Sequence, residues 1–130
     1  MGQTYTITDL AKEFQVTTRT IRHYEDEGLV QPLREGSARV YNNRDRGRLR
    51  LALRGKRLGI SLGDIRELFA LYDLAHNESK QVEEFLAKLD KHRAQLEQQQ
   101  TDIEVMLREF DFFSQQCRRL NQNKSRTDTG

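Results

Sequence analysis

The most regular pattern of apolar positions lies in the C-terminal part of the chain. No glycine or proline occurs between residues 79 and 120, and a set of positions recurs there at intervals of alternately four and three. This spacing is the heptad repeat of a coiled coil, in which one side of a helix packs against another helix. The positions are Val82, Leu86, Leu89, Arg93, Leu96, Gln100, Ile103, Leu107, Phe110, Ser114 and Cys117.

The repeat predicts a coiled-coil dimerisation helix over residues 77–120, followed by a polar, disordered tail over residues 121–130. Polar residues interrupt the repeat at Arg93, Gln100 and Ser114, and such insertions can fix the register and the number of helices. The dimer contacts are assigned to its apolar members, which are Val82, Leu86, Leu89, Leu96, Ile103, Leu107 and Phe110.

Shorter helices are predicted near the N-terminus. Thr8 and Asp9 are candidate N-caps for a helix that ends at Phe14, and Thr17 is the candidate cap of the next helix, which stops at Gly28. The turn between these two helices is very short. Two short helices joined in this way predict a helix-turn-helix.

The second of these helices has two different sides when its residues are placed at about 100° intervals. Its apolar side, with Ile21 and Tyr24, can pack against the first helix. The opposite side consists of Thr18, Arg19, Arg22 and His23. A basic face on a helix of this size fits the major groove of duplex DNA, where Arg19 and Arg22 can bind guanine or phosphate. The alternative is a solvated arginine face.

The segment after Pro32 predicts a small β-hairpin, or wing, with residues 35–37 as its turn. Arg39 and Tyr41 suit phosphate contacts or a reach into the minor groove. Tyr41 can equally pack on the apolar side chains of the hairpin, and both interpretations stay open at this point.

A third helix is predicted from its candidate cap Asn43 to about Leu58. Its arginines recur at intervals of four, four and three and form one stripe, made of Arg46, Arg50, Arg54 and Arg57. We interpret the stripe as phosphate contacts, with ion pairs to the acidic C-terminal half as the alternative. Ser61 then caps a fourth helix, with Asp64 three residues further on. Its predicted apolar side is Ile65, Leu68, Phe69 and Tyr72, and residues 76–78 form a loop.

The distribution of charge points to an anionic partner for the first half of the chain. The chain has 130 residues and a net charge of +2. Residues 1–60 hold 12 Lys/Arg against 7 Asp/Glu, whereas residues 61–130 hold 10 against 13. A basic first half and an acidic second half indicate that the first half binds an anion such as DNA.

Several classes of protein are excluded. Cys117 is the only cysteine, so an internal disulfide and a cysteine-held cluster within one chain are impossible. No apolar run approaches the roughly 18 residues that span a bilayer, and the N-terminus lacks a signal-peptide core, which predicts a cytoplasmic protein. The sequence contains no glycine-rich phosphate loop, HExxH motif or nucleophile elbow, so we expect no enzyme, no metal site and no cofactor.

These elements together predict an all-α fold with a small β-wing. A winged helix-turn-helix DNA-binding domain occupies residues 1–76, and the coiled-coil helix follows it. Two other functions stay open: a coiled-coil adaptor that binds acidic proteins with its basic face, and a thiol- or metal-responsive switch through Cys117. A lone cysteine in a helix seam is more often a small buried apolar residue.

Three stretches of the chain resemble bacterial MerR-type transcription regulators, and the resemblance extends over residues 4–116. The stretches are residues 17–29, 38–41 and 57–65. The resemblance implies a symmetric homodimer with an antiparallel coiled coil on promoter DNA, with RNA polymerase at the same promoter and the DNA bent and untwisted. It also implies that Arg19, Arg22, Tyr24 and Arg39 contact DNA.

Within the family, the short C-terminus and residues 53–57 look most like regulators of leucine/isovalerate and related acyl-CoA catabolism. The chain departs from the family at His23, where Tyr or Phe is common, and it lacks the metal-sensing cysteines of several branches. A small-molecule effector would need a small pocket beside the dimer helix. Its candidate lining residues are Phe69, Tyr72, His76 and Phe85, which can instead form the inter-helix core.

Overall fold

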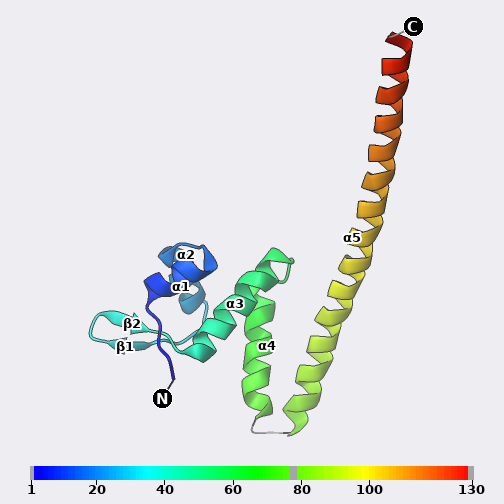
Figure 1. Ribbon diagram of the computed structural model, residues 1–130. Helices are drawn as coiled ribbons and strands as arrows, with labels where there is room; N and C mark the ends of the chain where they lie inside the picture. Colours follow the sequence, from blue (N-terminus) through cyan, green and yellow to red (C-terminus); the bar gives the residue numbers. More distant parts are fainter. Residues whose placement is uncertain (1, 77–78, 129–130) are drawn as a thin grey trace. The chain divides into compact units, whose positions relative to one another are not determined.

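The computed structural model describes residues 2–76 and 79–128, with the side chains of residues 2–76 and 80–125. Its elements in chain order are α1 (Ile7–Phe14), α2 (Thr18–Asp26), β1 (Leu33–Glu35), β2 (Ala38–Val40), α3 (Asn43–Arg57), α4 (Leu62–Ala75) and α5 (Ser79–Asp128) (Figure 1). The predicted helical fold with a small wing and a long C-terminal helix is confirmed. The chain forms two compact units, Met1–Lys88 and Leu89–Gly130, so the first turns of α5 belong to the first unit.

Two helices of the first unit begin at the predicted caps. The Thr20 N–H donates to Thr17 Oγ1 over 3.1 Å at the start of α2, and the Asp64 N–H donates to Ser61 Oγ over 3.1 Å at the start of α4. Gly28 follows α2 with a φ of 81°, a left-handed conformation that glycine adopts without strain. Helix α2, the predicted recognition helix, is therefore fixed at both ends by local sequence.

The other two predicted caps are wrong by one to three residues. Thr6 caps α1, because Asp9 is the third helical residue and closes a capping box with Thr6. Asn42 and not Asn43 caps α3, because Asp45 closes a second capping box with Asn42. In both helices the cap is the candidate with an acidic residue three positions further on, because that candidate can close a capping box.

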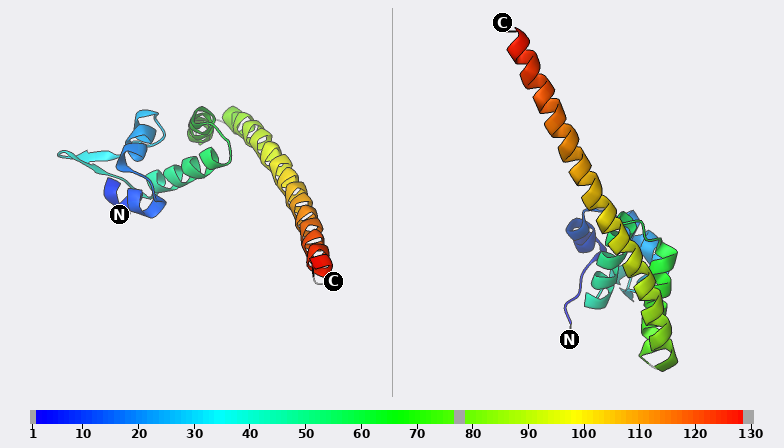
Figure 2. Two further views of the ribbon diagram at one scale, coloured as in Figure 1. Left: turned by 90° about the horizontal axis from the view of Figure 1, so that it is seen from above. Right: turned by 90° about the vertical axis from the view of Figure 1, so that its right-hand side faces the viewer.

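The wing is a two-stranded antiparallel hairpin in which Leu33 lies opposite Val40. Figure 2 shows it as a narrow ribbon that extends from the helices of the first unit. The residue after β2, Tyr41, pairs with Tyr5: their backbone N–H groups donate to each other's carbonyl oxygens over 2.8 and 2.9 Å. The segment before α1 therefore holds the base of the wing.

One apolar core joins the elements of the first unit. Its buried residues are Leu10, Ala11, Ile21, Tyr24, Leu29, Val30, Tyr41, Leu49, Ala52 and Ile65. At Gly55 a Cβ atom would lie 2.9 Å from Ile65 Cδ1. The absence of a side chain there lets α3 and α4 approach closely.

The predicted apolar side of α4 is partly correct. Ile65 is buried, and Leu68 and Phe69 are half-buried, but Tyr72 is exposed and Leu71 is buried instead. The Tyr72 ring lies edge-on to the His76 ring and tilted to the Phe85 ring, with centroid distances of 4.6 and 5.6 Å. Of the predicted loop over residues 76–78, residues 77 and 78 lie outside the described residues.

The long helix α5 continues to Asp128, so the tail predicted to be disordered from residue 121 is helical as far as that residue. The predicted heptad seam is exposed along the single chain: Leu96 is half-buried, and the other six apolar members are exposed. Exposed apolar side chains at heptad spacing leave one side of α5 available for a second helix. No helix in the described part of the chain is both long enough and apolar enough to cross a membrane.

Candidate nucleic-acid interface

The exposed side of α2 carries the predicted recognition residues. Arg19, Arg22 and His23 are exposed, Thr18 is half-buried, and the opposite side chains of Ile21 and Tyr24 are buried. The Arg22 Nη2 donates to Thr18 Oγ1 over 3.1 Å, one helical turn away. This bond orients Arg22 along the helix and leaves most of its donors free for a base edge or a phosphate.

Tyr24, for which the family resemblance implies a DNA contact, is a core residue, and of the two interpretations of Tyr41 the structure favours packing in the core. Their side chains are 1% and 0% exposed, so neither hydroxyl can reach a nucleic acid in this conformation. Both hydroxyls are buried without a hydrogen-bond partner among the described residues. Burial raises the pKa of Tyr41 to about 12, with the Glu25 carboxylate as the second cause.

The wing is tied to the recognition helix through a carboxylate. Arg39 Nε donates to Glu25 Oε2 over 2.6 Å, and Arg34 Nη2 lies 3.8 Å from Glu25 Oε1. The side chains of Arg39 and Glu25 are 23% and 17% exposed. Arg39 was predicted as a phosphate contact, and its position beside α2 is set by Glu25, which the sequence analysis did not single out.

The arginine stripe of α3 faces α1 over its first half. Arg46 Nε donates to both carboxylate oxygens of Glu13 over 2.8 and 2.9 Å, and Arg50 Nη2 lies 3.8 Å from the same group. The hydrogen bond from Arg46 lowers the pKa of Glu13. Arg46 also stacks over the Tyr5 ring at 5.3 Å. The ion pairs of Arg46 and Arg50 are therefore with α1 and not with the acidic C-terminal half.

The second half of the stripe differs. Arg54 and Arg57 are exposed, and no ion pair involves either of them within residues 2–76 and 80–125. Glu13 holds the first half of the stripe, and the second half has no ion pair among the described residues. Together the two halves form one cationic surface along α3, which Glu13 partly neutralises. Such a surface can bind several phosphates of one backbone strand.

Sequence reasoning did not single out Glu13, which belongs to no motif, or Glu25, which lies within the stretch 17–29 but has no partner there. Each is recognised only when the fold brings it against an arginine that is distant in the sequence. The same holds for Asp73 of α4, whose Oδ1 accepts from Arg44 and Arg48 over 2.6 Å each. Among the described residues no group of three or more His, Cys, Asp or Glu side chains could hold a metal ion, and Cys117 is exposed.

A capped basic helix behind a short turn, with a wing fixed beside it, defines a winged-helix DNA-binding protein. A family model described as "MerR HTH family regulatory protein" matches residues 5–71, and a second, "MerR, DNA binding", matches residues 46–111. The chain belongs to the MerR family and is a DNA-binding transcription regulator of that type.

Relatives and solved structures agree with this family. The chain is 36% identical over 107 residues to the HTH-type transcriptional regulator ZntR of Escherichia coli (strain K12), which covers 77% of this chain and 76% of the relative. It is 34% identical over 113 residues to the heavy metal-dependent transcription regulator 2 of Rhizobium meliloti (strain 1021), with coverage of 85% and 75%.

Among solved structures, HiNmlR, a MerR family regulator lacking the sensor domain and bound to promoter DNA, has the same fold. Its TM-score is 0.62 at 20% identity, and the match covers 87% of this chain and 92% of that chain. The assignment to the branch that regulates acyl-CoA catabolism stays a prediction.

Proposed function

We propose that the chain acts as a homodimer that binds promoter DNA with sequence specificity and distorts it. The observation that carries the proposal is the division of α2 into two sides. Arg19, Arg22 and His23 are exposed on one side, while Ile21 and Tyr24 anchor the other side in the core. A rigidly held basic helix is the element that enters a major groove.

The residues of the interface have different roles in this proposal. Arg19 and Arg22 bind base edges or phosphates in the major groove, and Thr18 and His23 contact the adjacent backbone. Arg39 binds phosphate from the wing, where Glu25 holds it. The stripe on α3, consisting of Arg46, Arg50, Arg54 and Arg57, follows the phosphate backbone.

The dimer forms through α5. Two copies of the exposed seam, packed as an antiparallel coiled coil, bury apolar side chains such as Ile103, Leu107 and Phe110 that a single chain leaves in water. A two-fold axis through this pair repeats the two α2 helices, and a separation of about 34–36 Å between them matches one turn of the duplex.

Distortion of the promoter requires energy that contacts from both subunits can offset. Bending a site of 20–30 base pairs costs on the order of 1–6 kcal/mol. In a dimer, each of the phosphate contacts listed above occurs twice. In this proposal RNA polymerase binds the distorted promoter, the protein works in the cytoplasm, and a small-molecule effector adjusts its activity.

Two measurements on the full chain test the proposal. Light scattering after size-exclusion chromatography gives the oligomeric state, and a monomer at working concentration would contradict the dimer. Fluorescence anisotropy then compares a duplex from the region upstream of the protein's own gene with a scrambled duplex. We expect tighter binding to the former and a slope of log affinity against log salt near −7, for roughly eight phosphates. Binding to poly-glutamate as tight as to either duplex would favour the adaptor function instead.

A further inference from the structure

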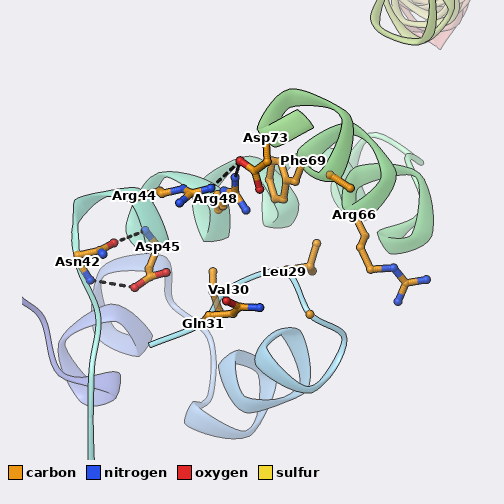
Figure 3. Close-up of a pocket in the computed structure, with 12 residues that line it drawn as sticks. Leu29, Val30, Gln31, Asn42, Arg44, Asp45, Arg48, Arg66, Phe69 and Asp73 are labelled. Carbon is orange, nitrogen blue, oxygen red and sulfur yellow. Dashed lines mark hydrogen bonds and ion pairs between the residues drawn. The ribbon is translucent and has the colours of Figure 1, made fainter. Parts of the chain in front are cut away.

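A polar hollow lies away from the exposed side of α2. It has a volume of about 240 Å³ and is bounded by the loop after α2, the first half of α3 and one side of α4. Figure 3 shows Arg44, Arg48 and Asp73 along one wall and Gln31 on the opposite wall. Leu29, Val30 and Phe69 supply apolar atoms to the lining. The hollow thus combines two cations with an apolar surface.

The two arginines share one counterion. The Nη2 atoms of Arg44 and Arg48 each lie 2.6 Å from the same oxygen, Oδ1 of Asp73. Arg48 is only 17% exposed and stacks over the Phe69 ring at 4.7 Å. A guanidinium group has five N–H donors, and in the described residues the hydrogen bonds of these two arginines occupy one donor each. The pair therefore has donors for a second anion.

The hollow is separate from the proposed phosphate surface. At about 100° per residue, Arg44 and Arg48 lie within about 40° of each other on α3. Arg46 and Arg50 lie roughly on the opposite side of the same helix, where they contact Glu13 of α1. The Arg44–Arg48 pair instead faces α4, so DNA bound along the stripe does not explain it.

We propose that this hollow binds a small organic monocarboxylate, whose carboxylate is bound by Arg44 and Arg48 in competition with Asp73. Three arginines (Arg44, Arg48 and Arg66) and two aspartates line it, and Arg66 is already paired with the Glu27 carboxylate, with Nη1 and Oε2 3.4 Å apart. Arg44 and Arg48 therefore supply the donors for an added anion, and the carboxylate of Asp73 that they share repels a phosphate dianion more strongly than a monoanion. Since a water molecule occupies about 30 Å³, the hollow has room for roughly eight non-hydrogen atoms.

The position of the hollow connects such a ligand to DNA binding. Its lining residues 28–31 follow the recognition helix directly, and Arg66 Nη1 donates to the Glu27 carbonyl oxygen at the end of that helix over 3.2 Å. A ligand that binds one arrangement of this loop more tightly changes DNA affinity, and DNA changes ligand affinity by the same factor. The consequence for transcription rests on the proposed function, but binding of the ligand itself does not.

Calorimetry on the full chain without DNA tests the site, with butyrate as the probe and its uncharged isostere butyramide as the control. We expect saturable butyrate binding in chloride buffer and none for butyramide. Arg44→Gln should weaken butyrate binding about tenfold, because a charge-assisted hydrogen bond is lost. Asp73→Asn should strengthen it several-fold, because the internal competitor loses its charge. Arg119→Gln removes the same charge from an exposed position of α5 outside the heptad seam and should change nothing.

Three results would overturn the proposal. The first is the absence of saturable butyrate binding to a folded wild-type protein. The second is an equal loss in Arg44→Gln and Arg119→Gln, which would indicate attraction by net charge alone. The third is inorganic phosphate binding more tightly than butyrate at the same ionic strength. Because no DNA is present, each of these results leaves the DNA-binding proposal standing.

Discussion

Arg39 of the wing and Glu25 of the recognition helix are joined by a hydrogen bond of 2.6 Å between Nε and Oε2. The two residues are 14 positions apart and lie on different elements. Because both side chains are mostly withdrawn from water, the bond is stronger than an exposed ion pair. It sets the angle between two elements that must reach the same duplex.

Loss of this bond should weaken operator binding. We expect Glu25→Ala to lower operator affinity about tenfold, because the wing is no longer held beside α2. Glu25→Gln should stay closer to the wild type, since the amide oxygen still accepts from Arg39. Fluorescence anisotropy on operator DNA measures both. Unchanged binding by Glu25→Ala would contradict the positioning role of Glu25. Tighter binding would mean that repulsion between Glu25 and phosphate outweighs that role.

The Glu13 carboxylate accepts hydrogen bonds from Arg46 that a phosphate could otherwise accept. We expect Glu13→Gln to bind random duplex more tightly and to steepen the log–log salt slope by about 2 per dimer, one phosphate per subunit. Glu67→Gln is the matched control, because it removes the same charge from an ion pair with Lys88 on another surface. Equal slopes in the two variants would show that Arg46 does not face the duplex.

Arg22 should contribute to specificity more than to general affinity. Thr18 orients this side chain along the exposed side of α2, and a bidentate contact to a base discriminates by about 1–3 kcal/mol. We expect Arg22→Ala to reduce the preference for operator over scrambled DNA by at least tenfold, with a smaller loss on scrambled DNA. Equal losses on both duplexes would assign Arg22 to phosphate.

Tyr41→Phe should leave DNA affinity unchanged and raise the free energy of unfolding by about 1 kcal/mol, because it removes a buried hydroxyl that has no described partner. Chemical denaturation at fixed protein concentration gives the stability, and anisotropy gives the affinity. A clear loss of operator affinity would contradict the interpretation of Tyr41 as a core residue.

The same tyrosine predicts a dependence on alkaline pH. Its pKa rises from 10.0 to about 12 in the folded state. The pKa of Tyr41 is higher in the folded state than in the unfolded state, so folding favours the neutral phenol. The contribution of Tyr41 to the free energy of unfolding is therefore complete below pH 10 and is lost as the pH rises toward 12. Tyr41→Phe should therefore flatten the decline in stability over this range. Denaturation midpoints from pH 9 to pH 11.5 test this, and parallel curves for the two proteins would contradict it.

Local sequence was sufficient for most of the fold. Thr17 and Ser61 were identified as caps because a hydroxyl residue precedes each helical pattern, and Gly28 as a helix end because it suits a left-handed residue. Thr6 and Asn42 were missed because several candidate caps are adjacent there. Only the capping box with the acidic residue three positions on selects one of them.

The candidate site was predictable where it depends on one helix and not where it depends on contacts across the fold. The helical wheel placed Tyr24 on the buried side of α2, and this was correct; the DNA contact taken from the family resemblance was not. Glu13 and Arg46 are 33 positions apart. No periodicity within one element relates them, so their pairing required the tertiary structure.

The heptad seam can be tested against the other side of α5. Leu107 belongs to the seam, whereas Val105 lies about 160° away from it around the helix, and both are exposed in the single chain. We expect Leu107→Asn to shift the dimer toward monomer in sedimentation velocity and to lower operator affinity, because each subunit then binds alone. Val105→Asn makes the same chemical change off the seam and should leave the dimer intact. If the two variants dissociate equally, dimerisation does not follow the heptad pattern, and the face that carries Val105 belongs to the interface as well.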